Sequence, residues 1–326
     1  MLPPLPNNTI LRERYKLTKI VGHGGMGSIY RAEDLRLPGR LCAVKEVQPE
    51  SGASPEIRQQ AQEQFLQEAS ILARLDHPNL PKVSDFFHED GRDYLVMDFV
   101  AGKDLRQISQ ETWGSGESLS EEQVLRWAEQ ILDALIYLHD HEPPVLHRDV
   151  KPANIKLTPS NRIKLVDFGL VKLMDRDDAR TITVVQGRGT ALYTPLEQYG
   201  GDSGHTDVRS DIYALGATFY HLLTGQTPPS AKARFLTPGR LRPPREVNGA
   251  VSKKVSDAVM WAMEMHPDER PADLRQFAGA LLGDEPRPLP ARGNQSPGWR
   301  DAFWEHRMVL LSALVLFVVA VLLTLF

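Results

Sequence analysis

The sequence predicts an α+β fold in two parts, with a strand-rich segment followed by a helix-rich segment. Short runs of β-branched and aromatic residues, bounded by Gly, Pro and Asp, occupy roughly the first third of the chain. After these runs, apolar residues recur at spacings of three and four, as they do along one face of a helix. The chain has 326 residues, of which 41% are hydrophobic and 25% charged, an ordinary globular composition with enough length for two lobes.

The charge balance and cysteine content exclude some classes of protein. Lys and Arg total 38 and Asp and Glu total 42, so the formal net charge is -4. Nucleic-acid-binding domains usually carry a strong basic excess, so nucleic acid is not an expected partner. The single cysteine, Cys42, excludes an intrachain disulfide and favours a reducing compartment.

In the strand-rich part, the apolar runs are short, and Gly, Pro or a polar turn separates each from the next. One helix interrupts them around Glu63–Leu75, where Phe65, Ala69 and Leu72 recur at helical spacing. The sequence His77-Pro78-Asn79 is expected to end that helix. The predicted strands are Tyr15–Val21, Ser28–Ala32, Leu41–Val47, Val83–His88 and Tyr94–Val100.

In the helix-rich part, the clearest helix begins at Ser120, which forms a capping-box pattern with Gln123, and continues to about His139. Its apolar residues make one broad stripe, as expected for a helix that packs against a core. Further helices are predicted over Ser210–Thr224, Val251–Met263 and Ala272–Leu282.

The last part of the sequence differs from both. Residues 282–307 are rich in Pro, Gly and Arg and are predicted to form a linker. From Met308 to Phe326 no residue is charged. A helix of this length would extend about 28 Å, close to the roughly 30 Å hydrocarbon core of a bilayer, so 308–326 is predicted to be a transmembrane helix. The alternative, a buried core helix, would normally keep a polar face.

The first candidate site is the glycine-rich run Gly22-His23-Gly24-Gly25-Met26-Gly27. Glycines let the backbone approach phosphate oxygens closely and present N–H groups to them. The predicted strands on both sides argue against a dinucleotide-binding loop, because such a loop would open a helix. Taken by itself, the run is also compatible with a plain glycine-rich hairpin.

The second candidate is Lys45, within the apolar strand sequence Ala43-Val44-Lys45. Burial of a lysine is costly unless the amine meets an anion. The predicted helix carries Glu68, which could hold the Lys45 amine against nucleotide phosphates. The alternative is an edge-strand lysine that faces water.

The third candidate is the most specific. The sequence His147-Arg148-Asp149-Val150-Lys151-Pro152-Ala153-Asn154 is followed by Asp167-Phe168-Gly169. With the glycine run, Lys45 and Glu68, these motifs appear in the order and spacing of the protein kinases. Residues 15–281 therefore resemble a eukaryotic-type protein kinase, of the kind found as membrane-anchored serine/threonine kinases in bacteria. The resemblance implies a two-lobed fold, with an N-lobe over about 15–97, a C-lobe over about 98–281 and an N-terminal extension over 1–14.

The resemblance also implies a role for each matching residue. Lys45 would grip the α- and β-phosphates of ATP and pair with Glu68, while Lys151 would contact the γ-phosphate. Asp149 would accept the proton of the substrate hydroxyl, and Asn154 and Asp167 would hold Mg²⁺. The remaining nucleotide contacts implied are Gly22, His23, Gly24, Gly25, Met26, Gly27, Ile29, Ala43, the gatekeeper Met97, and the hinge residues Asp98 and Val100.

Other matching residues are implied to be structural. Asp211 would brace the catalytic loop through its backbone, and Glu197 and Arg270 would form a buried ion pair. His147 is expected to be a packed structural histidine and not a base. The chain departs from the family at Pro195-Leu196-Glu197, where Ala-Pro-Glu is usual, and this puts its preference among substrate peptides in question.

The function expected from these residues is transfer of the ATP γ-phosphate to Ser and Thr hydroxyls of proteins. A pseudokinase is the first alternative, but such proteins usually lose residues equivalent to Lys45, Asp149 or Asp167, all of which stand here. A small-molecule kinase is the second alternative, and the long segment from Asp167 to Glu197, with its Thr190, argues against it.

Regulation and location are also expected from the sequence. Thr181 and Thr183 are the expected sites of autophosphorylation, with Arg148, Arg180 or Arg188 as cationic partners, and a dimer would support phosphorylation in trans. The N-terminal part lacks the apolar run of a secretory signal peptide. Basic residues also precede the predicted membrane span, which favours a single-pass protein of the cell membrane with a cytoplasmic kinase domain. These basic residues are Arg292, Arg300 and Arg307.

Overall fold

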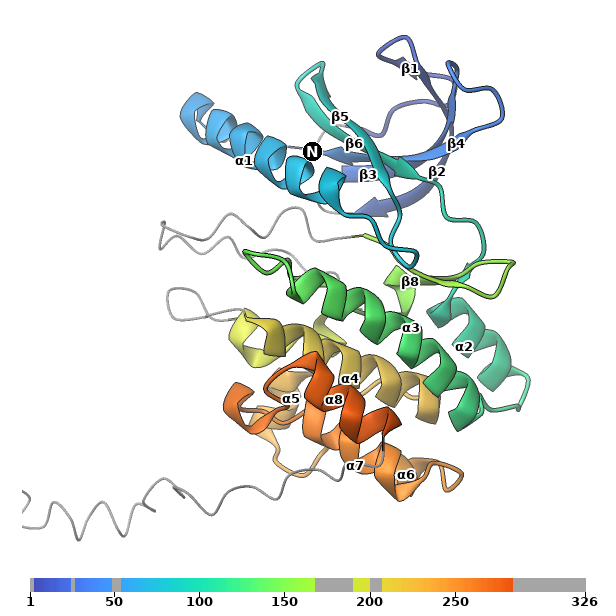
Figure 1. Ribbon diagram of the computed structural model, residues 1–326, viewed down its shortest axis with the longest axis vertical. Coiled ribbons are helices and arrows are strands. Elements are labelled where there is room, and N and C mark those ends of the chain that lie inside the picture. Colours follow the sequence, from blue (N-terminus) through green and yellow to red (C-terminus); the bar gives the residue numbers. More distant parts are fainter. Residues whose placement is uncertain (1–2, 25–26, 49–53, 168–189, 200–206, 284–326) are drawn as a thin grey trace, which may run out of the picture. The chain divides into compact units, whose positions relative to one another are not determined.

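The computed structural model describes residues 3–24, 27–48, 54–167, 190–199 and 207–283. These residues form a strand-rich lobe and a helical lobe, in the order that the sequence predicts (Figure 1). The linker from residue 284 onward, the predicted membrane helix 308–326, and Gly25, Met26, Thr181 and Thr183 lie outside the described residues. Within the described ranges, no helix is both long enough and apolar enough to cross a membrane.

The first lobe contains a six-stranded antiparallel sheet with strand order β1-β2-β3-β4-β6-β5. All five predicted strands are confirmed within three residues at each end, and the short β1 is additional. The strands are β1 Ile10–Leu11, β2 Tyr15–Gly24, β3 Gly27–Asp34, β4 Leu41–Val47, β5 Val83–Glu89 and β6 Arg92–Asp98.

The two faces of this sheet pack against different apolar clusters, as the side chains of β4 show. Cys42 and Val44 alternate along β4 into an apolar cluster with Tyr15, Tyr30 and other buried residues of the sheet. Since successive side chains of a strand point to opposite faces, Lys45 lies on the other face. Ala43 shares that face and packs against the larger apolar core, which continues into the second lobe.

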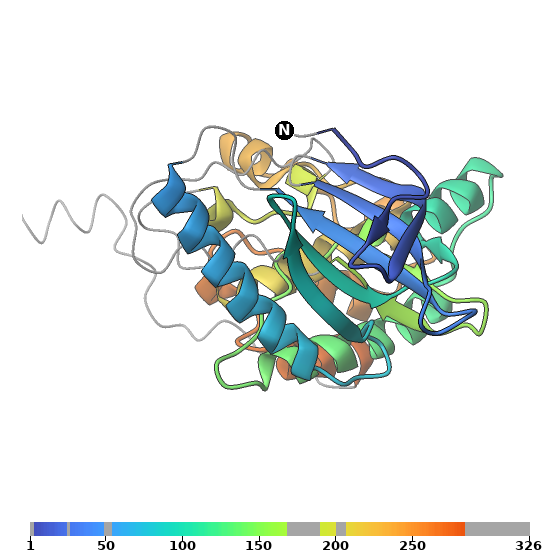
Figure 2. The ribbon, with the colours of Figure 1, turned by 90° about the horizontal axis from the view of Figure 1, so that it is seen from above.

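Helix α1, Pro55–Arg74, lies beside β5 and β6 and contacts both strands (Figure 2). It begins eight residues before the predicted start at Glu63. Ser54 caps it by accepting a hydrogen bond from Ile57 N at 3.4 Å, and Pro55 follows at the first helical position. Its first turns are largely exposed and polar, so they lack the apolar spacing on which the sequence prediction depended.

The second lobe is mainly helical and is built around α4, Val208–Thr224, in which every residue from Ser210 to Thr224 is buried. A helix that is buried all round lies in the middle of a helical domain. The other helices surround it, and a three-stranded sheet adjoins them. These elements are α2 Leu105–Gly114, α3 Glu121–His139, α5 Ala231–Leu236, α6 Pro244–Val247, α7 Lys253–Ala262, α8 Leu274–Leu282, β7 Lys103–Asp104, β8 Ile155–Leu157 and β9 Ile163–Leu165.

The predicted helices of this lobe are confirmed, and the predicted cap of α3 is present, because Ser120 Oγ accepts from Gln123 N at 3.2 Å. Helix α2 was not predicted. It is capped by Asp104, whose carboxylate accepts from Gln107 N at 2.8 Å while the Gln107 side chain accepts from Asp104 N. The same capping-box logic that located α3 could have located α2.

Candidate active site

The loop from His147 to Asn154 is held in place by one buried carboxylate of α4. Asp211 is 1% exposed and accepts hydrogen bonds from the backbone N–H groups of His147 at 2.8 Å and Arg148 at 2.7 Å. His139 Nε2 of α3 lies 2.9 Å from the same carboxylate. Burial alone would raise the pKa of Asp211, but these hydrogen bonds, chiefly that of His139, outweigh it and lower the pKa. The predicted brace of the catalytic loop is confirmed.

Two residues of the site have strained backbones. Arg148 has φ 62° and Asp167 has φ 66°, in the left-handed region that non-glycine residues rarely adopt. Such conformations cost on the order of 1–3 kcal/mol each and persist only when surrounding contacts fix them. For Arg148, the bond from its N–H to Asp211 is such a contact. The strain therefore lies at the residue directly before the candidate catalytic residue Asp149 and at the candidate metal ligand Asp167.

Two side chains hold the Asp149 carboxylate. Lys151 Nζ donates to Oδ2 at 2.7 Å, and Asn154 Nδ2 donates to the same oxygen at 2.8 Å and to the Asp149 carbonyl at 2.9 Å. Lys151 also donates to Thr190 Oγ1 at 2.9 Å, so the loop is tied to the segment that begins at residue 190. The carboxylate is 21% exposed and can therefore meet an incoming hydroxyl. The arrangement can position a proton acceptor and one cation beside a substrate.

The strand lysine and the carboxylate Asp167 meet across the two lobes. Lys45 Nζ donates to Asp167 Oδ1, and the Lys45 side chain is only 13% exposed. Burial would raise the pKa of Asp167, but the Lys45 ammonium and its hydrogen bond lower the pKa further than burial raises it. The buried Lys45 amine therefore pairs with a carboxylate and does not simply face water. Glu68 lies on α1 and is 3% exposed, and its pairing with Lys45 stays a prediction.

The donor set beside Asp149 fits a magnesium ion. Mg²⁺ prefers oxygen ligands and is usually held by one or two carboxylates together with substrate phosphates. Asp167 offers a carboxylate and Asn154 an amide oxygen, whose amide nitrogen is already directed to Asp149. Among the described residues, no group of three or more His, Cys, Asp and Glu gathers into a protein-only metal cage. The residues therefore fit a metal that is shared with a nucleotide.

Three of the predicted nucleotide contacts, Ile29, Ala43 and Met97, lie on the face of the sheet that carries Lys45. Ile29 of β3 pairs directly with Lys45 of β4, so the two are cross-strand neighbours. Gly27 has φ +136°, and a Cβ there would collide with the Glu46 carbonyl oxygen, so only glycine fits. His23 Nδ1 lies 3.0 Å from Ser28 Oγ. The ends of β2 and β3 are thereby joined across the glycine-rich turn.

At the hinge, the structure adds a residue that the sequence analysis missed. Met97 is 7% exposed near the end of β6, and the chain leaves the strand at Asp98. Lys156 of β8 donates to the Val100 carbonyl at 3.0 Å, and its ammonium lies 5.8 Å from the Phe99 ring. Burial lowers the pKa of Lys156. The sequence signal was weak, because Lys156 stands between Ile155 and Leu157 in a strand of only three residues.

Two structural predictions are settled by the contacts. Arg270 and Glu197 form a bidentate ion pair, with Nη1 to Oε1 at 2.6 Å and Nη2 to Oε2 at 3.0 Å, which confirms the predicted pair. His147 is fully buried, and burial lowers its pKa. A histidine kept neutral inside the core is a poor candidate for a base facing solvent, as predicted. At the departure from the family pattern, Pro195 has φ -72° and directly precedes the short helix Leu196–Gln198, which contains Glu197.

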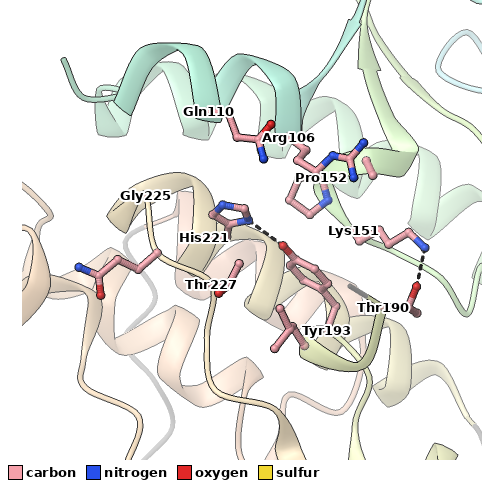
Figure 3. Close-up of a pocket in the computed structure, with 12 residues that line it drawn as sticks. Arg106, Gln110, Lys151, Pro152, Thr190, Tyr193, His221, Gly225 and Thr227 are labelled. Atoms are coloured by element: carbon pink, nitrogen blue, oxygen red, sulfur yellow. Dashed lines mark hydrogen bonds between the residues drawn. The ribbon is translucent and has the colours of Figure 1, made fainter. Parts of the chain in front are cut away.

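A pocket of about 730 Å³ adjoins the catalytic loop and was not predicted (Figure 3). Its lining comes from α2, the catalytic loop, the segment after residue 190, and the end of α4. Tyr193 Oη and His221 Nδ1 share a 2.7 Å hydrogen bond within it. The residues that line it are Arg106, Gln110, Lys151, Pro152, Ala153, Thr190, Leu192, Tyr193, His221, Gly225, Gln226 and Thr227.

Comparison with known proteins is consistent with this geometry. A family model described as "Protein kinase domain" matches residues 15–278. The chain is 34% identical to serine/threonine-protein kinase B of Synechocystis sp. over 284 residues, which cover 84% of this chain and 47% of that protein. It is 32% identical to serine/threonine-protein kinase PknB of Mycolicibacterium smegmatis over 282 residues, with 83% of this chain and 43% of that protein covered. The chain thus spans less than half the length of these curated relatives.

Solved structures agree with the fold. The apo form of PpkA-294 superposes with a TM-score of 0.66 at 28% sequence identity, covering 85% of this chain and 99% of that one. The PknI kinase domain of Mycobacterium tuberculosis gives a TM-score of 0.62 at 27% identity, covering 85% of this chain and 98% of that one.

Proposed function

The chain belongs to the protein kinase family, and on that premise we propose that it transfers the γ-phosphate of ATP to Ser and Thr hydroxyls of proteins. The observation that carries the proposal is the set of contacts around Asp149. Lys151 and Asn154 fix its carboxylate, and Asp167 meets Lys45 on the opposite lobe. A family member that had lost the activity would have no need to keep every one of these groups in place.

The reaction needs little covalent participation by the protein, because phosphoryl transfer depends mainly on positioning and charge stabilisation. The substrate hydroxyl oxygen forms a bond to the γ-phosphorus, and the bond from that phosphorus to the β,γ-bridging oxygen breaks. Asp149 accepts the hydroxyl proton. Lys151, 2.7 Å from Asp149, supplies positive charge where the transferred group carries negative charge.

Asp167 and Asn154 would hold Mg²⁺, which neutralises charge on the nucleotide phosphates. Lys45 is directed into the same space and would bind the α- and β-phosphates. Its present partner, Asp167, pairs with the amine and orients it although the side chain is mostly buried. Gly22 and Gly27 belong to the turn that would cover the phosphates.

The direct test is an assay of phosphate transfer from labelled Mg-ATP to a generic protein substrate, with hydrolysis of the product to identify the phosphoamino acids. Phosphoserine and phosphothreonine are expected. Label on a small molecule alone would support the alternative of a small-molecule kinase. Nucleotide binding without any transfer would support a pseudokinase.

We also propose that activity is switched on by autophosphorylation at Thr181 or Thr183, which lie outside the described residues. A phosphate adds about -1.5 to -2 charge and needs a cationic partner to order a segment. Arg148 is fixed by Asp211 through its backbone and is our candidate partner, through a charge-assisted bond. Mass spectrometry after incubation with Mg-ATP is expected to find one of the two threonines modified.

The double variant Thr181→Ala, Thr183→Ala should lose most of its activity, and activation should speed up with protein concentration if a dimer phosphorylates in trans. A fully active double variant would disprove this mechanism and leave the kinase proposal intact. A rate of activation independent of concentration would instead disprove the dimer.

We further propose that residues 308–326 anchor the protein in the cell membrane with its kinase domain in the cytoplasm. Support comes from the uncharged apolar sequence and from Arg292, Arg300 and Arg307 before it, since basic residues favour the cytoplasmic side. Deletion of 308–326 should move the protein from the membrane fraction to the soluble fraction with its activity retained. Full-length protein that is soluble without detergent would contradict the anchor.

A further inference from the structure

The pocket beside the catalytic loop carries an excess of positive charge. Arg106 of α2 and Lys151 are the cations of its lining, and none of its described lining residues is acidic. Lys151 is 2.7 Å from Asp149 and is neutralised by it. Arg106 is 54% exposed, and its nearest carboxylate, Asp104, is 4.0 Å away, at the limit of an ion pair. Arg106 is therefore the cation that an incoming group can reach.

The polar groups opposite Arg106 are neutral. His221 is 6% exposed and shares a hydrogen bond with Tyr193, and burial lowers the pKa of His221. Burial also raises the pKa of Tyr193. Neither side chain can supply the negative charge that a basic ligand would require. Figure 3 shows Arg106 and Gln110 on the α2 side of the pocket and Tyr193 and His221 facing them.

The pocket is close enough to Asp149 to receive part of a bound substrate peptide. Lys151 and Thr190 belong to its lining, and Lys151 is bonded to Asp149. A sphere of about 730 Å³ is about 11 Å across, the length of about three residues of extended chain. A peptide whose hydroxyl meets Asp149 can therefore place a side chain three residues or fewer away into the pocket.

We infer that this pocket selects an acidic side chain, Asp or Glu, within about three residues of the phosphorylated hydroxyl, and that Arg106 determines this specificity. The guanidinium offers donors in a planar fork that matches a carboxylate. The inference rests on the proposed function, since it names the class of protein substrate used by the same site. A basic side chain is disfavoured because it meets Arg106 and finds no acidic partner among the described lining residues.

The test compares peptides that contain one Ser flanked by Ala, with Glu, Lys or Gln placed in turn at each of four positions on either side. We expect kcat/KM to be about 3- to 10-fold higher for Glu than for Lys at one or two neighbouring positions, the scale of a partly exposed ion pair. Arg106→Glu should reverse the order of these peptides, and Arg106→Lys should retain it. Glu is well tolerated near a helix N-terminus, so the fold of α2 should persist.

Arg126→Glu is the matched control. Arg126 lies on α3, is 57% exposed and pairs with Glu122 at 2.6 Å, away from the pocket. It should leave the peptide order unchanged. Equal shifts in both variants would mean that only the overall charge matters and would overturn the inference, as would equal kcat/KM for Glu and Lys peptides at every position.

Binding separates this inference from the proposed function. Fluorescence anisotropy of labelled Glu and Lys peptides on the full chain measures the subsite without requiring transfer. Tighter binding of the Glu peptide, reversed in Arg106→Glu, supports the pocket even if no phosphate is transferred. In that case the kinase proposal fails and the acidic subsite stands. If the Glu and Lys peptides bind equally well and phosphate is transferred normally, the kinase proposal stands and the acidic subsite is overturned.

Discussion

Replacement of Asp149 by Asn is expected to lower turnover by at least about 100-fold, the lower end of the contribution of a positioned general base. The amide has nearly the same shape as the carboxylate but cannot accept the substrate proton. The substitution also removes the negative charge beside Lys151, whose Nζ donates to Asp149 Oδ2 at 2.7 Å. The rate should therefore fall while the loop stays in place, because Asp211 still holds the backbone of His147 and Arg148.

Nucleotide affinity separates this result from general damage. Lys45, Asn154 and Asp167 remain in the Asp149→Asn variant, so binding of Mg-ATP should change by only a few fold, as measured by calorimetry. Asp133→Asn is a suitable control, since Asp133 is 69% exposed and its carboxylate lies 3.2 Å from His77 Nε2, away from the catalytic loop. It should keep full activity. Turnover close to wild type in Asp149→Asn would reject the assigned role of Asp149.

The fold was largely predictable because its signals are local. Strands β2 to β6 are short apolar runs between turn residues, and each run carries its own evidence. The start of α1 was predicted wrongly because its first turns face solvent and show no apolar period, so that only the Ser54 cap marks them. The three-residue strands β8 and β9 are too short for any period to be recognised.

In the candidate site, too, the sequence predicts what neighbouring residues form and not what distant residues form together. Asp149, Lys151 and Asn154 stand within six residues of one another, so a single loop brings them together and the motif predicts the cluster. The Lys45–Asp167 contact joins residues 122 positions apart, and only the family resemblance brought them to one site. The lining of the pocket combines Arg106, Thr190 and His221 from three separate elements. No spacing in the sequence could have placed those side chains together.

Replacement of Arg270 by Met is expected to destabilise the protein by about 3–5 kcal/mol, the usual cost of breaking a buried ion pair by removing one partner. The Arg270 side chain is 0% exposed and donates to both oxygens of Glu197. It also donates to the backbone carbonyls of Glu264, Met265 and Arg209. Methionine fills part of the space but satisfies none of these acceptors, so the largely buried Glu197 carboxylate and three carbonyls lose the donors that Arg270 supplies.

The measurement is thermal unfolding, with a fall in Tm of at least about 6 °C expected for a protein of this size. Arg275→Met is the matched control, since Arg275 also pairs bidentately with a carboxylate, at 2.9 and 2.5 Å from Asp140. That pair is exposed, at 62% and 50% for its two side chains, so its loss should lower Tm much less than the loss of Arg270. Equal losses in the two variants would contradict the importance of burial.

The pH dependence of stability gives an independent check on the same pair. Burial would raise the pKa of the Glu197 carboxyl, but Arg270 outweighs burial and lowers the pKa from its ordinary 4.5. A carboxyl whose pKa is lowered by folding contributes stability above its unfolded pKa and loses that contribution as the pH falls through the folded pKa. The difference in Tm between wild type and Arg270→Met should therefore be full at pH 7 and shrink below about pH 4.5. A difference that stayed constant down to the acid-unfolding range would show that Arg270 stabilises the lobe through its backbone carbonyl contacts and not through Glu197.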